Sequence, residues 1–293
     1  MSIMSVRILL VGLMLSSVSA CSESDSATPK SNPYDLGFVA QELVREGGSN
    51  CLDPQAAQKQ DGASGQADAG GSHDELCARV TFSWPEIRSA SSPELALKLN
   101  QYIQNALQNS FEDEVSTTPA TVQGLEAYAN GFIENYKQDG NAFSSWMLER
   151  RMEIIFTTEQ LISFALSEDG YTGGAHPFSG VNYSVINLQT GTPVSLADLL
   201  NPGFEAPLNV AGEKVFRRVR DIPDSESLDE QGFSFENSVF ALNDNFAVLK
   251  EGLRFRFNSY EVAAYAMGPT ELLLPYEDIQ ALIRPDGPLG HAE

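Results

Sequence analysis

Alternating apolar and polar positions first appear in the stretch CARVTFSWPEI. There Val80, Phe82 and Trp84 alternate with polar or charged residues, which is the period of a strand with one buried face. Pro85 follows directly, and it predicts that the strand ends there or lies at a sheet edge. The stretch therefore predicts one strand near the start of the globular region.

Two stretches of helical period follow this strand. In the first, Ser92 can cap a helix and Pro93 suits its first turn. The second runs from about Val122 to Lys137 and ends before Asp139-Gly140. Their apolar stripes consist of Leu95, Leu99, Tyr102, Ile103, Ala106 and Leu107, and of Leu125, Tyr128, Ala129, Phe132, Ile133 and Tyr136. Since these positions recur at helical spacing, we expect both stripes to face a core.

The second half of the chain changes from helical to strand patterns. Strands are predicted at Trp146–Thr157, Leu161–Glu168, Val181–Asn187, Phe246–Leu249, Leu253–Phe257 and Thr270–Leu274. Helices are predicted from Ser195, over Pro207–Arg220, and from Pro275 to Ile283. Because strands and helices do not alternate regularly, the fold class is α+β, with antiparallel sheets and packed helices in two tightly associated subdomains.

The same patterns divide the chain into five parts. We predict a lipoprotein signal peptide at 1–20, a polar tether at 21–35, an N-terminal α+β subdomain at 36–143, a C-terminal α+β subdomain at 144–284 and a tail at 285–293. Within the N-terminal subdomain, residues 52–76 are too polar and too rich in Gly, Ala and Gln to bury a core, so we expect a disordered loop.

The N-terminus combines Arg7, a short apolar run and the sequence VSAC. The run is too short to span a bilayer as a helix, and it is typical of an export signal. The VSAC sequence resembles the bacterial lipobox, which implies that Cys21 is lipidated; the alternative is a secretory signal with an incidental cysteine. Ser22 in place of aspartate implies sorting to the outer membrane. We therefore expect a lipid-anchored protein of the bacterial cell envelope, on the periplasmic face of the outer membrane, which contacts the membrane only through its anchor.

Two further cysteines, Cys51 and Cys77, remain after the anchor. In an oxidising compartment a disulfide between them is the first expectation. It would close a loop of about 25 residues and stabilise the fold by about 3 kcal/mol in the chain-entropy model. The alternative is a metal site formed with His73.

Charge narrows the possible partners. The chain has 18 Lys and Arg against 40 Asp and Glu, a formal net charge of −22. Such a surface excludes nucleic acid as a partner, because phosphate binding needs clustered basic residues. It favours a soluble surface, and it is compatible with a basic protein or a cation as a visiting partner.

A search for chemistry finds no nucleophile elbow, zinc-protease motif, phosphate loop or Rossmann glycine pattern. Only His176, of three histidines, falls in a region predicted to fold. Acidic residues are numerous, and we expect Glu149, Glu153, Glu159, Glu168 and Asp169 to be solvated strand and turn residues. We therefore predict no catalytic residue, cofactor or metal, although a glycosidase-like carboxylate pair stays open.

The stretch DGYTGGAHPFSG, Asp169 to Gly180, is the most distinctive loop. Its glycine pair permits a tight turn between two strands, and Pro177 holds His176 extended. The first interpretation is a structural turn with a hydrogen-bonded imidazole. The second is a ligand-contacting loop, together with the segment YEVAAYAMG. The candidate contact residues are Tyr171, Gly173, Gly174, His176, Phe178, Tyr260 and Tyr265.

Two stretches carry a family resemblance. YTGGAHPFSGVNYSVINLQTGTPVSLADLL and FNSYEVAAYAMGPTELLLPYEDI resemble, in order and spacing, segments of the RsiV/PdaC-type extracytoplasmic domain family. The resemblance is strong from about Trp146 to Ile283 and weaker from Arg79 to Asn141. Ala264 and Pro177 depart from the family, which usually has proline and glycine there, and both concern loop geometry rather than fold.

The resemblance implies an α+β extracytoplasmic domain that senses lysozyme in anti-sigma factors and accompanies peptidoglycan deacetylase domains in other proteins. This chain shows neither a cytoplasmic anti-sigma segment nor a deacetylase metal motif, so neither activity carries over. We expect a non-catalytic envelope protein that recognises a lysozyme-like protein or peptidoglycan. The alternatives are a carboxylate-dependent enzyme acting on peptidoglycan or another glycan, and a structural or assembly lipoprotein.

Overall fold

The structure is a computed structural model that describes residues 30–31, 36–48, 77–109, 121–139 and 144–290. The predicted lipidation site Cys21, the cysteine Cys51, His73 and the 52–76 loop lie outside these residues. The anchor and the disulfide with Cys77 therefore stay predictions. In the part of the chain that is described, no helix has the length and apolar character needed to cross a bilayer.

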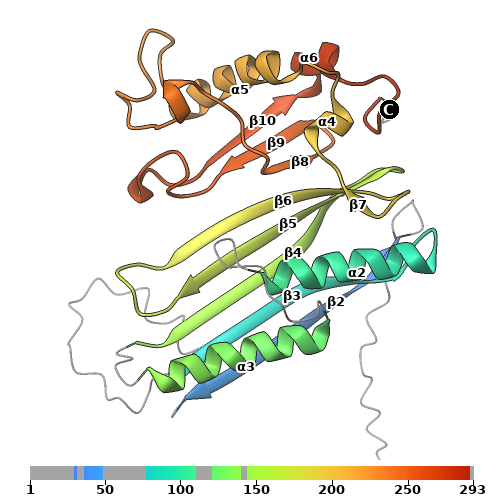
Figure 1. Cartoon of the computed structure of the whole chain (residues 1–293), viewed down its shortest axis with the longest axis vertical. Helices are drawn as coiled ribbons and strands as arrows, with labels where there is room; N and C mark the ends of the chain where they lie inside the picture. Colours follow the sequence, from blue (N-terminus) through green and yellow to red (C-terminus); the bar gives the residue numbers. More distant parts are fainter. Residues whose placement is uncertain (1–29, 32–35, 49–76, 110–120, 140–143, 291–293) are drawn as a thin grey trace, which may run out of the picture.

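A seven-stranded sheet forms the larger layer (Figure 1). Its strands follow sequence order: β1 (Lys30–Ser31), β2 (Gly37–Gly48), β3 (Cys77–Ser89), β4 (Trp146–Thr157), β5 (Leu161–Tyr171), β6 (Phe178–Asn187) and β7 (Thr192–Pro193). Five of the neighbouring pairs are antiparallel, and β3 pairs with β4 in parallel. The parallel pair differs from the all-antiparallel expectation, because the chain crosses over through two helices between these strands.

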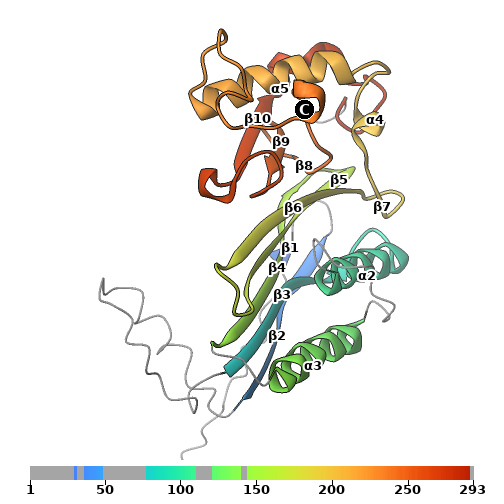
Figure 2. The same cartoon turned by 60° about the vertical axis from the view of Figure 1, so that its left-hand side comes forward.

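Those helices, α2 (Pro93–Gln108) and α3 (Val122–Gln138), cover one face of the sheet (Figures 1 and 2). The predicted cap is present: the Ser92 hydroxyl accepts a hydrogen bond from the Leu95 amide at 3.1 Å. The stripe residues Leu99, Ile103 and Leu125 are fully buried in the core beneath the two helices, where α2 packs on β3 and β4 and α3 packs on β2 and β3. Burying such apolar stripes is what holds the helices on the sheet, since isolated helices of this length are marginal in water.

A buried ion pair ties the helices to the sheet. Arg150 of β4 is 1% exposed and Glu168 of β5 is 3% exposed, and the Arg150 Nε donates to the Glu168 carboxylate. The other guanidinium nitrogens donate to the Leu107 carbonyl at 2.8 Å and to the Tyr128 hydroxyl at 3.0 Å. The prediction that Glu168 is solvated was therefore wrong. Its side chain points to the helix-covered face, in phase with the buried Leu166.

The rest of the chain forms a second, smaller layer. It contains α4 (Leu196–Leu199), α5 (Glu205–Arg220), β8 (Phe246–Val248), β9 (Gly252–Phe257), β10 (Thr270–Pro275), α6 (Tyr276–Ile279) and short 3-10 turns, of which η3 spans Tyr265–Met267. The three strands form an antiparallel sheet, and α5 packs on it (Figure 1). A phenylalanine cluster around Phe216 fills the space between them, with ring centroids 4.9 Å from Phe233 and 5.4 Å from Phe240.

The α+β class is confirmed, but the expected boundary at residues 143–144 falls between the paired strands β3 and β4. Two clusters of buried residues divide the chain later. The first reaches from Leu36 to Leu188, and the second takes in Val194 to Leu289 together with Leu161 and Val185 of the large sheet. We call residues 36–188 the large-sheet unit and residues 194–289 the C-terminal unit.

The structure also differs from the sequence predictions at two individual strands. Strand β2 was not predicted, because only Gly37 and Leu43 are buried along it and a register shift at Gly37/Phe38 breaks the period. Pro85 does not end β3. The pairing of β3 with β4 stops at Ser83, so beyond that point the strand has a neighbour only on the β2 side. Proline is tolerated at such a one-sided position.

Candidate functional site

The structure brings together the two loops that the sequence singled out. The turn after β5 carries His176, and the segment between β9 and β10 carries Tyr260 and Tyr265. The His176 ring stacks on the Tyr265 ring, with centroids 4.3 Å apart and planes 19° apart. The Tyr260 ring lies 6.0 Å from the His176 ring and 5.4 Å from the Tyr265 ring. We call His176, Tyr260 and Tyr265 the aromatic cluster.

Hydrogen bonds fix the imidazole within the cluster. His176 Nδ1 lies 2.9 Å from the Pro177 carbonyl oxygen, and Nε2 lies 3.0 Å from the Tyr260 hydroxyl. Because a carbonyl oxygen only accepts, the Nδ1–H group donates to the Pro177 carbonyl, and the Tyr260 hydroxyl is the partner of Nε2. The Tyr265 hydroxyl donates to the same Pro177 carbonyl at 3.3 Å. Both ring nitrogens are thus used internally, which leaves aromatic faces and edges for contact with a partner.

Glycines explain the shape of the β5–β6 turn. Gly173 has φ +84°, a conformation that favours glycine. A Cβ at Gly170 would lie 2.2 Å from the Phe178 ring, so only glycine permits this ring to lie across the strand. Phe178 is nevertheless 40% exposed. The β5–β6 loop is therefore a turn that depends on glycine, and it also presents an exposed aromatic side chain.

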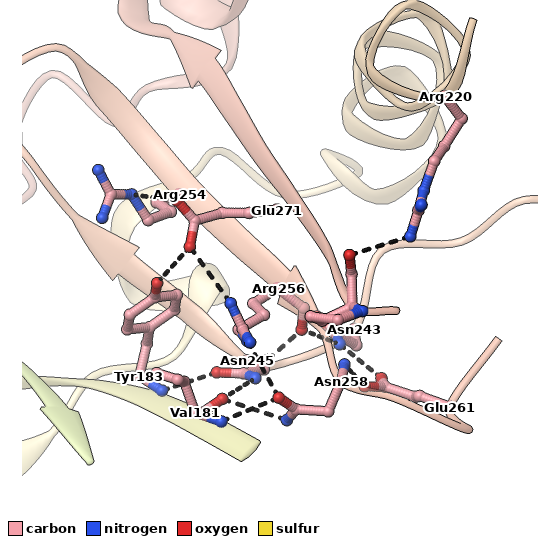
Figure 3. Close-up of polar contacts among 11 residues, drawn as sticks. Val181, Tyr183, Arg220, Asn243, Asn245, Arg254, Arg256, Asn258, Glu261 and Glu271 are labelled. Carbon is pink, nitrogen blue, oxygen red and sulfur yellow. Dashed lines mark hydrogen bonds and ion pairs between the residues drawn. The ribbon is translucent and has the colours of Figure 1, made fainter. Parts of the chain in front are cut away.

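A strained turn presents Tyr260. Its φ is +70°, which a residue with a side chain adopts at a cost. The Asn258 amide donates to the Glu261 carboxylate at 2.8 Å, and the Asn243 side chain donates to the same carboxylate at 2.6 Å (Figure 3). These bonds hold the turn while Tyr260 stays 62% exposed. Backbone strain retained at an exposed aromatic residue is a feature of functional loops.

This strain gives a comparison of two variants at one position. We expect Tyr260→Gly to be more stable than Tyr260→Ala by about 1 kcal/mol, because glycine adopts positive φ without the Cβ penalty. Both variants lose the same ring, so the difference between their free energies of unfolding in urea measures the cost of a Cβ at this positive φ. Equal stabilities would show that the turn is unstrained.

Arg220, the last residue of α5, anchors the other end of the segment. Its guanidinium donates to the carbonyls of Met267, Gly268 and Pro269 at 2.9, 3.0 and 2.9 Å. It also donates from Nε to the Thr270 hydroxyl at 2.8 Å and lies over the Phe233 ring, 5.3 Å from the centroid. A half-buried arginine that organises successive carbonyls fixes the loop on which Tyr265 stands.

Two asparagines join the units along the free edge of β6 (Figure 3). Asn245 donates to the Val181 carbonyl at 2.8 Å and accepts from the Tyr183 amide at 2.7 Å. Asn258 donates to the Val181 carbonyl at 3.1 Å and accepts from the Val181 amide at 2.9 Å. The side-chain amides thus take the place of a neighbouring strand. They pair with backbone groups at a sheet edge that would otherwise be free to pair with a strand of another chain.

An ion-pair group lies beside these asparagines. The Tyr183 hydroxyl donates to Glu271 at 2.7 Å, and Glu271 also lies 3.4 Å from Arg254 Nε (Figure 3). Burial, followed by the hydrogen bond with Glu271, raises the pKa of Tyr183 above its ordinary value. Tyr183 therefore stays protonated, and it acts as a donor rather than as a base.

An acidic loop borders the aromatic cluster. Ser234 donates to the Val262 carbonyl at 2.8 Å, and Phe233 forms an isolated bridge with Ala263. The loop that precedes this contact carries four exposed carboxylates, which we call the acidic rim: Asp224, Glu226, Asp229 and Glu230. Within the described ranges, none of the four forms a salt bridge. An aromatic centre beside carboxylates that form no salt bridge is therefore available to a basic partner.

A pair of carboxylates faces the other side of the sheet. Glu149 of β4 and Asp169 of β5 are directly opposed, on the face without α2 and α3. Burial, and then the Glu149 charge, raises the pKa of Asp169, while Arg151 and Arg256 oppose the shift. Like charges directly across a strand pair destabilise a sheet. The solvent exposure of Asp169 keeps this effect small.

The raised pKa predicts a pH-dependent effect of Asp169→Asn. A carboxyl group with a raised folded-state pKa loses stability as pH rises through that pKa, so the wild type is penalised at neutral pH. We expect Asp169→Asn to be more stable at pH 7 by less than about 1 kcal/mol, and equal to wild type below pH 4. Thermal unfolding across this range measures the difference. A destabilised variant at pH 7 would contradict it.

The predicted contact residues do not all share one place. His176, Tyr260 and Tyr265 meet directly, and Gly173 shapes the turn that carries His176, whereas Gly174 lies in the same turn with no conformation or close contact that requires glycine. Tyr171 is half-buried at the end of β5, opposite Met147. Cys77 begins β3. Within the described part of the chain, no group of three or more histidine, cysteine or acidic residues is placed to hold a metal ion.

Sequence reasoning missed the supporting residues Arg220, Asn245 and Asn258. The asparagines stand in the stretches NDN and FNSYE, whose turn-forming residues were a signal of local structure but not of a partner strand. Nothing in the sequence near Arg220 indicated which carbonyls it would reach.

Two family models match the chain. Residues 72–179 match a family described as Deacetylase PdaC, and residues 197–277 match DUF3298, described as a protein of unknown function. The boundary between the large-sheet unit and the C-terminal unit lies in the interval 180–196 that separates the two matched ranges. The predicted resemblance to a PdaC-type domain is confirmed. No curated protein sequence matches the chain.

Two crystal structures show the same fold. A member of the DUF3298 family from Bacteroides fragilis matches with a TM-score of 0.67 and 19% identity, over 89% of this chain and 98% of that chain. A DUF3298 family protein from Pseudomonas aeruginosa matches with a TM-score of 0.57 and 19% identity, over 85% of this chain and 95% of that chain. At this identity the similarity concerns the fold.

Proposed function

We propose that this chain, which combines a PdaC-type region with a DUF3298 region, is a non-catalytic binding protein of the cell envelope. It is anchored by lipid at Cys21, on the periplasmic face of the outer membrane. Its partner is a basic, lysozyme-like protein that acts on the cell wall. The aromatic cluster is the centre of the binding surface and the acidic rim is its border.

The observation that carries this proposal is the stack of His176, Tyr260 and Tyr265, in which His176 and Tyr260 are exposed and Tyr265 is half-buried. Tyrosines offer a large contact area at low entropic cost, and they are enriched where binding energy concentrates. Exposed tyrosine on a strained, well-braced turn has no role in a core. A structural purpose alone would not need Tyr260 to stand 62% exposed at a positive φ.

Charge decides between the two partner classes. The rim carboxylates and the net charge of −22 attract a basic protein and accelerate its association. Peptidoglycan carries carboxylates of its own in its peptide stems, so an acidic surface repels it. The aromatic cluster alone would suit a glycan, but its acidic border favours the protein.

The proposal is tested with the purified full chain, a basic lysozyme and insoluble peptidoglycan. We expect saturable binding to lysozyme at low ionic strength. Binding should weaken as salt is added, because salt screens the attraction between the carboxylates and the basic partner. We expect no enrichment in the peptidoglycan pellet. Absence of lysozyme binding at low salt would refute the proposal, and sedimentation with peptidoglycan instead would assign the glycan as the partner.

One observation favours a carboxylate-dependent glycan hydrolase as a second candidate. Glu149 and Asp169 are directly opposed, and Asp169 has the raised pKa of a group suited to donate a proton. Glu149→Gln and Asp169→Asn would then each abolish release of reducing ends from peptidoglycan. Absence of hydrolysis by the wild-type protein would exclude this candidate.

A further inference from the structure

A pocket of about 410 Å³ opens where the two units meet, in a different set of residues from the aromatic cluster. Its walls come from the end of α2, from the helix-covered face of β4 to β6, and from the segment before β8. The lining residues are Tyr102, Ala106, Asn109, Met152, Leu166, Asn182, Tyr183, Ser184, Asp244 and Asn245. Its volume lies within the range of about 300–1,000 Å³ that small-molecule sites occupy, and junctions between units are a common place for such sites.

The floor of the pocket is apolar. Met152 and Leu166 are 3% and 7% exposed and belong to the large-sheet core, and Ala106 adds a methyl group from α2. An apolar floor stabilises a ligand that has a flat or weakly polar face, because that face leaves water on binding.

Two polar side chains on the pocket walls have no interaction partner within the described part of the protein. Neither the Asn182 amide nor the Asp244 carboxylate has a hydrogen-bond or ion-pair partner among the residues that the structure describes. The neighbouring Tyr102 hydroxyl interacts with the Ser184 side chain, and burial raises the pKa of Tyr102, so it stays a neutral donor. The pocket therefore offers an amide, two hydroxyls and one carboxylate.

The charge of the lining selects the class of ligand. No lysine, arginine or histidine lines the pocket, so an anion would meet only Asp244 and be repelled. A cation pairs with that carboxylate, and hydroxyl groups on the ligand match the amide and hydroxyls of the walls.

We propose that this pocket binds a small hydroxyl-bearing amine, of which an amino sugar is the simplest example. Asp244 pairs with the ammonium group, and Asn182 and Ser184 bond to the hydroxyls. The apolar face of the ring lies on Met152 and Leu166. Since Asp244 belongs to the C-terminal unit and the other four residues to strands of the large-sheet unit, a bound ligand joins both units.

The position of Asn245 couples ligand binding to the junction between the two units. Its side chain lines the pocket and also satisfies the β6 edge at Val181 and Tyr183 (Figure 3). A ligand that packs beside Asn245 holds this bridge in place. Ligand that binds only the folded arrangement stabilises it by mass action, so unfolding temperature should rise with ligand concentration.

The test uses the purified full chain and four monosaccharides that differ in charge or in the presence of a basic amine. We expect D-glucosamine to bind saturably in titration calorimetry and to raise the unfolding temperature. D-glucose lacks the charge, N-acetyl-D-glucosamine lacks the basic amine, and D-galacturonate carries the opposite charge. Each should bind at least about tenfold more weakly, because a charge-assisted bond contributes about 1.5–3 kcal/mol.

Two variants locate the site. Asp244→Asn should weaken glucosamine about tenfold and leave glucose unchanged, and Asn182→Ala should weaken both. Asp278→Asn, which removes an exposed aspartate of α6 outside the pocket, serves as the matched control and should bind like wild type. Circular dichroism checks that each variant is folded.

Three results would overturn the proposal. The first is the absence of saturable binding by any of the four sugars. The second is equal or tighter binding of glucose or galacturonate, which would contradict the ligand class. The third is glucosamine binding that Asp244→Asn does not weaken, which would place the amine elsewhere on the acidic surface.

Discussion

Arg150→Met is expected to lower the free energy of unfolding of the large-sheet unit by about 3–5 kcal/mol. The substitution leaves Glu168 buried without its cation, and it removes the donors to the Leu107 carbonyl and the Tyr128 hydroxyl. The two tryptophans of the chain, Trp84 and Trp146, both pack in the large-sheet core. Their fluorescence in urea therefore reports this unit without signal from the C-terminal unit.

Two controls separate burial from the mere loss of a charge. Arg151→Met removes the neighbouring arginine, whose exposed partner is Glu149, and should cost less than about 1 kcal/mol. The double variant Arg150→Met/Glu168→Leu removes both buried charges and should recover most of the lost stability. A double variant as unstable as Arg150→Met would show that the carboxylate is not the source of the effect.

Tyr265→Ala is expected to weaken binding of a basic lysozyme about 30-fold, which corresponds to about 2 kcal/mol. The ring lies at the centre of the aromatic cluster, where it stacks on His176 and braces the turn through the Pro177 carbonyl. Removing it deletes contact area and releases the imidazole from its position. Surface plasmon resonance with the immobilised full chain measures the change, which should lie mainly in the dissociation rate.

Tyr265→Phe and Val210→Ala provide the matched comparisons. The first keeps the stacked ring and loses only the bond to Pro177, so it should retain binding within a few-fold of wild type. The second removes an exposed apolar side chain of α5 and should have no effect. Unchanged binding by a folded Tyr265→Ala would contradict the role of the cluster.

Local signals in the sequence predicted most of the elements. Ser92 and Pro93 marked the start of α2, and alternation marked β4, β5 and β9 within a few residues of their ends. These elements follow from capping and periodicity, which are short-range properties.

The unit boundary could not be predicted in the same way. The pairing of β3 with β4 joins Ala78 to Trp146 across two helices, and no local pattern encodes so distant a partner. The sequence does contain an indication that the Arg150 side chain is buried. Arg150 stands in phase with the buried Leu148 and Met152, but arginine is rarely buried, so this phase alone does not predict a buried charge.

The candidate site shows the same division. Each loop was recognisable by itself, the first from its glycines before His176 and the second from its tyrosines. Their contact joins residues 84 positions apart, His176 and Tyr260, and depends on how the units pack. Asn245 and Asn258 set that packing through backbone groups of β6, whose positions only the folded sheet defines.

We propose that the aromatic cluster is the surface that binds the basic partner. Hydrogen–deuterium exchange of the full chain, alone and saturated with a basic lysozyme, tests it most directly. We expect slower exchange at the turn 172–178, at 260–268 and at the acidic loop 224–233, with no change on α3. Protection confined to other surfaces, or unchanged exchange at both turns under saturating partner, would contradict it.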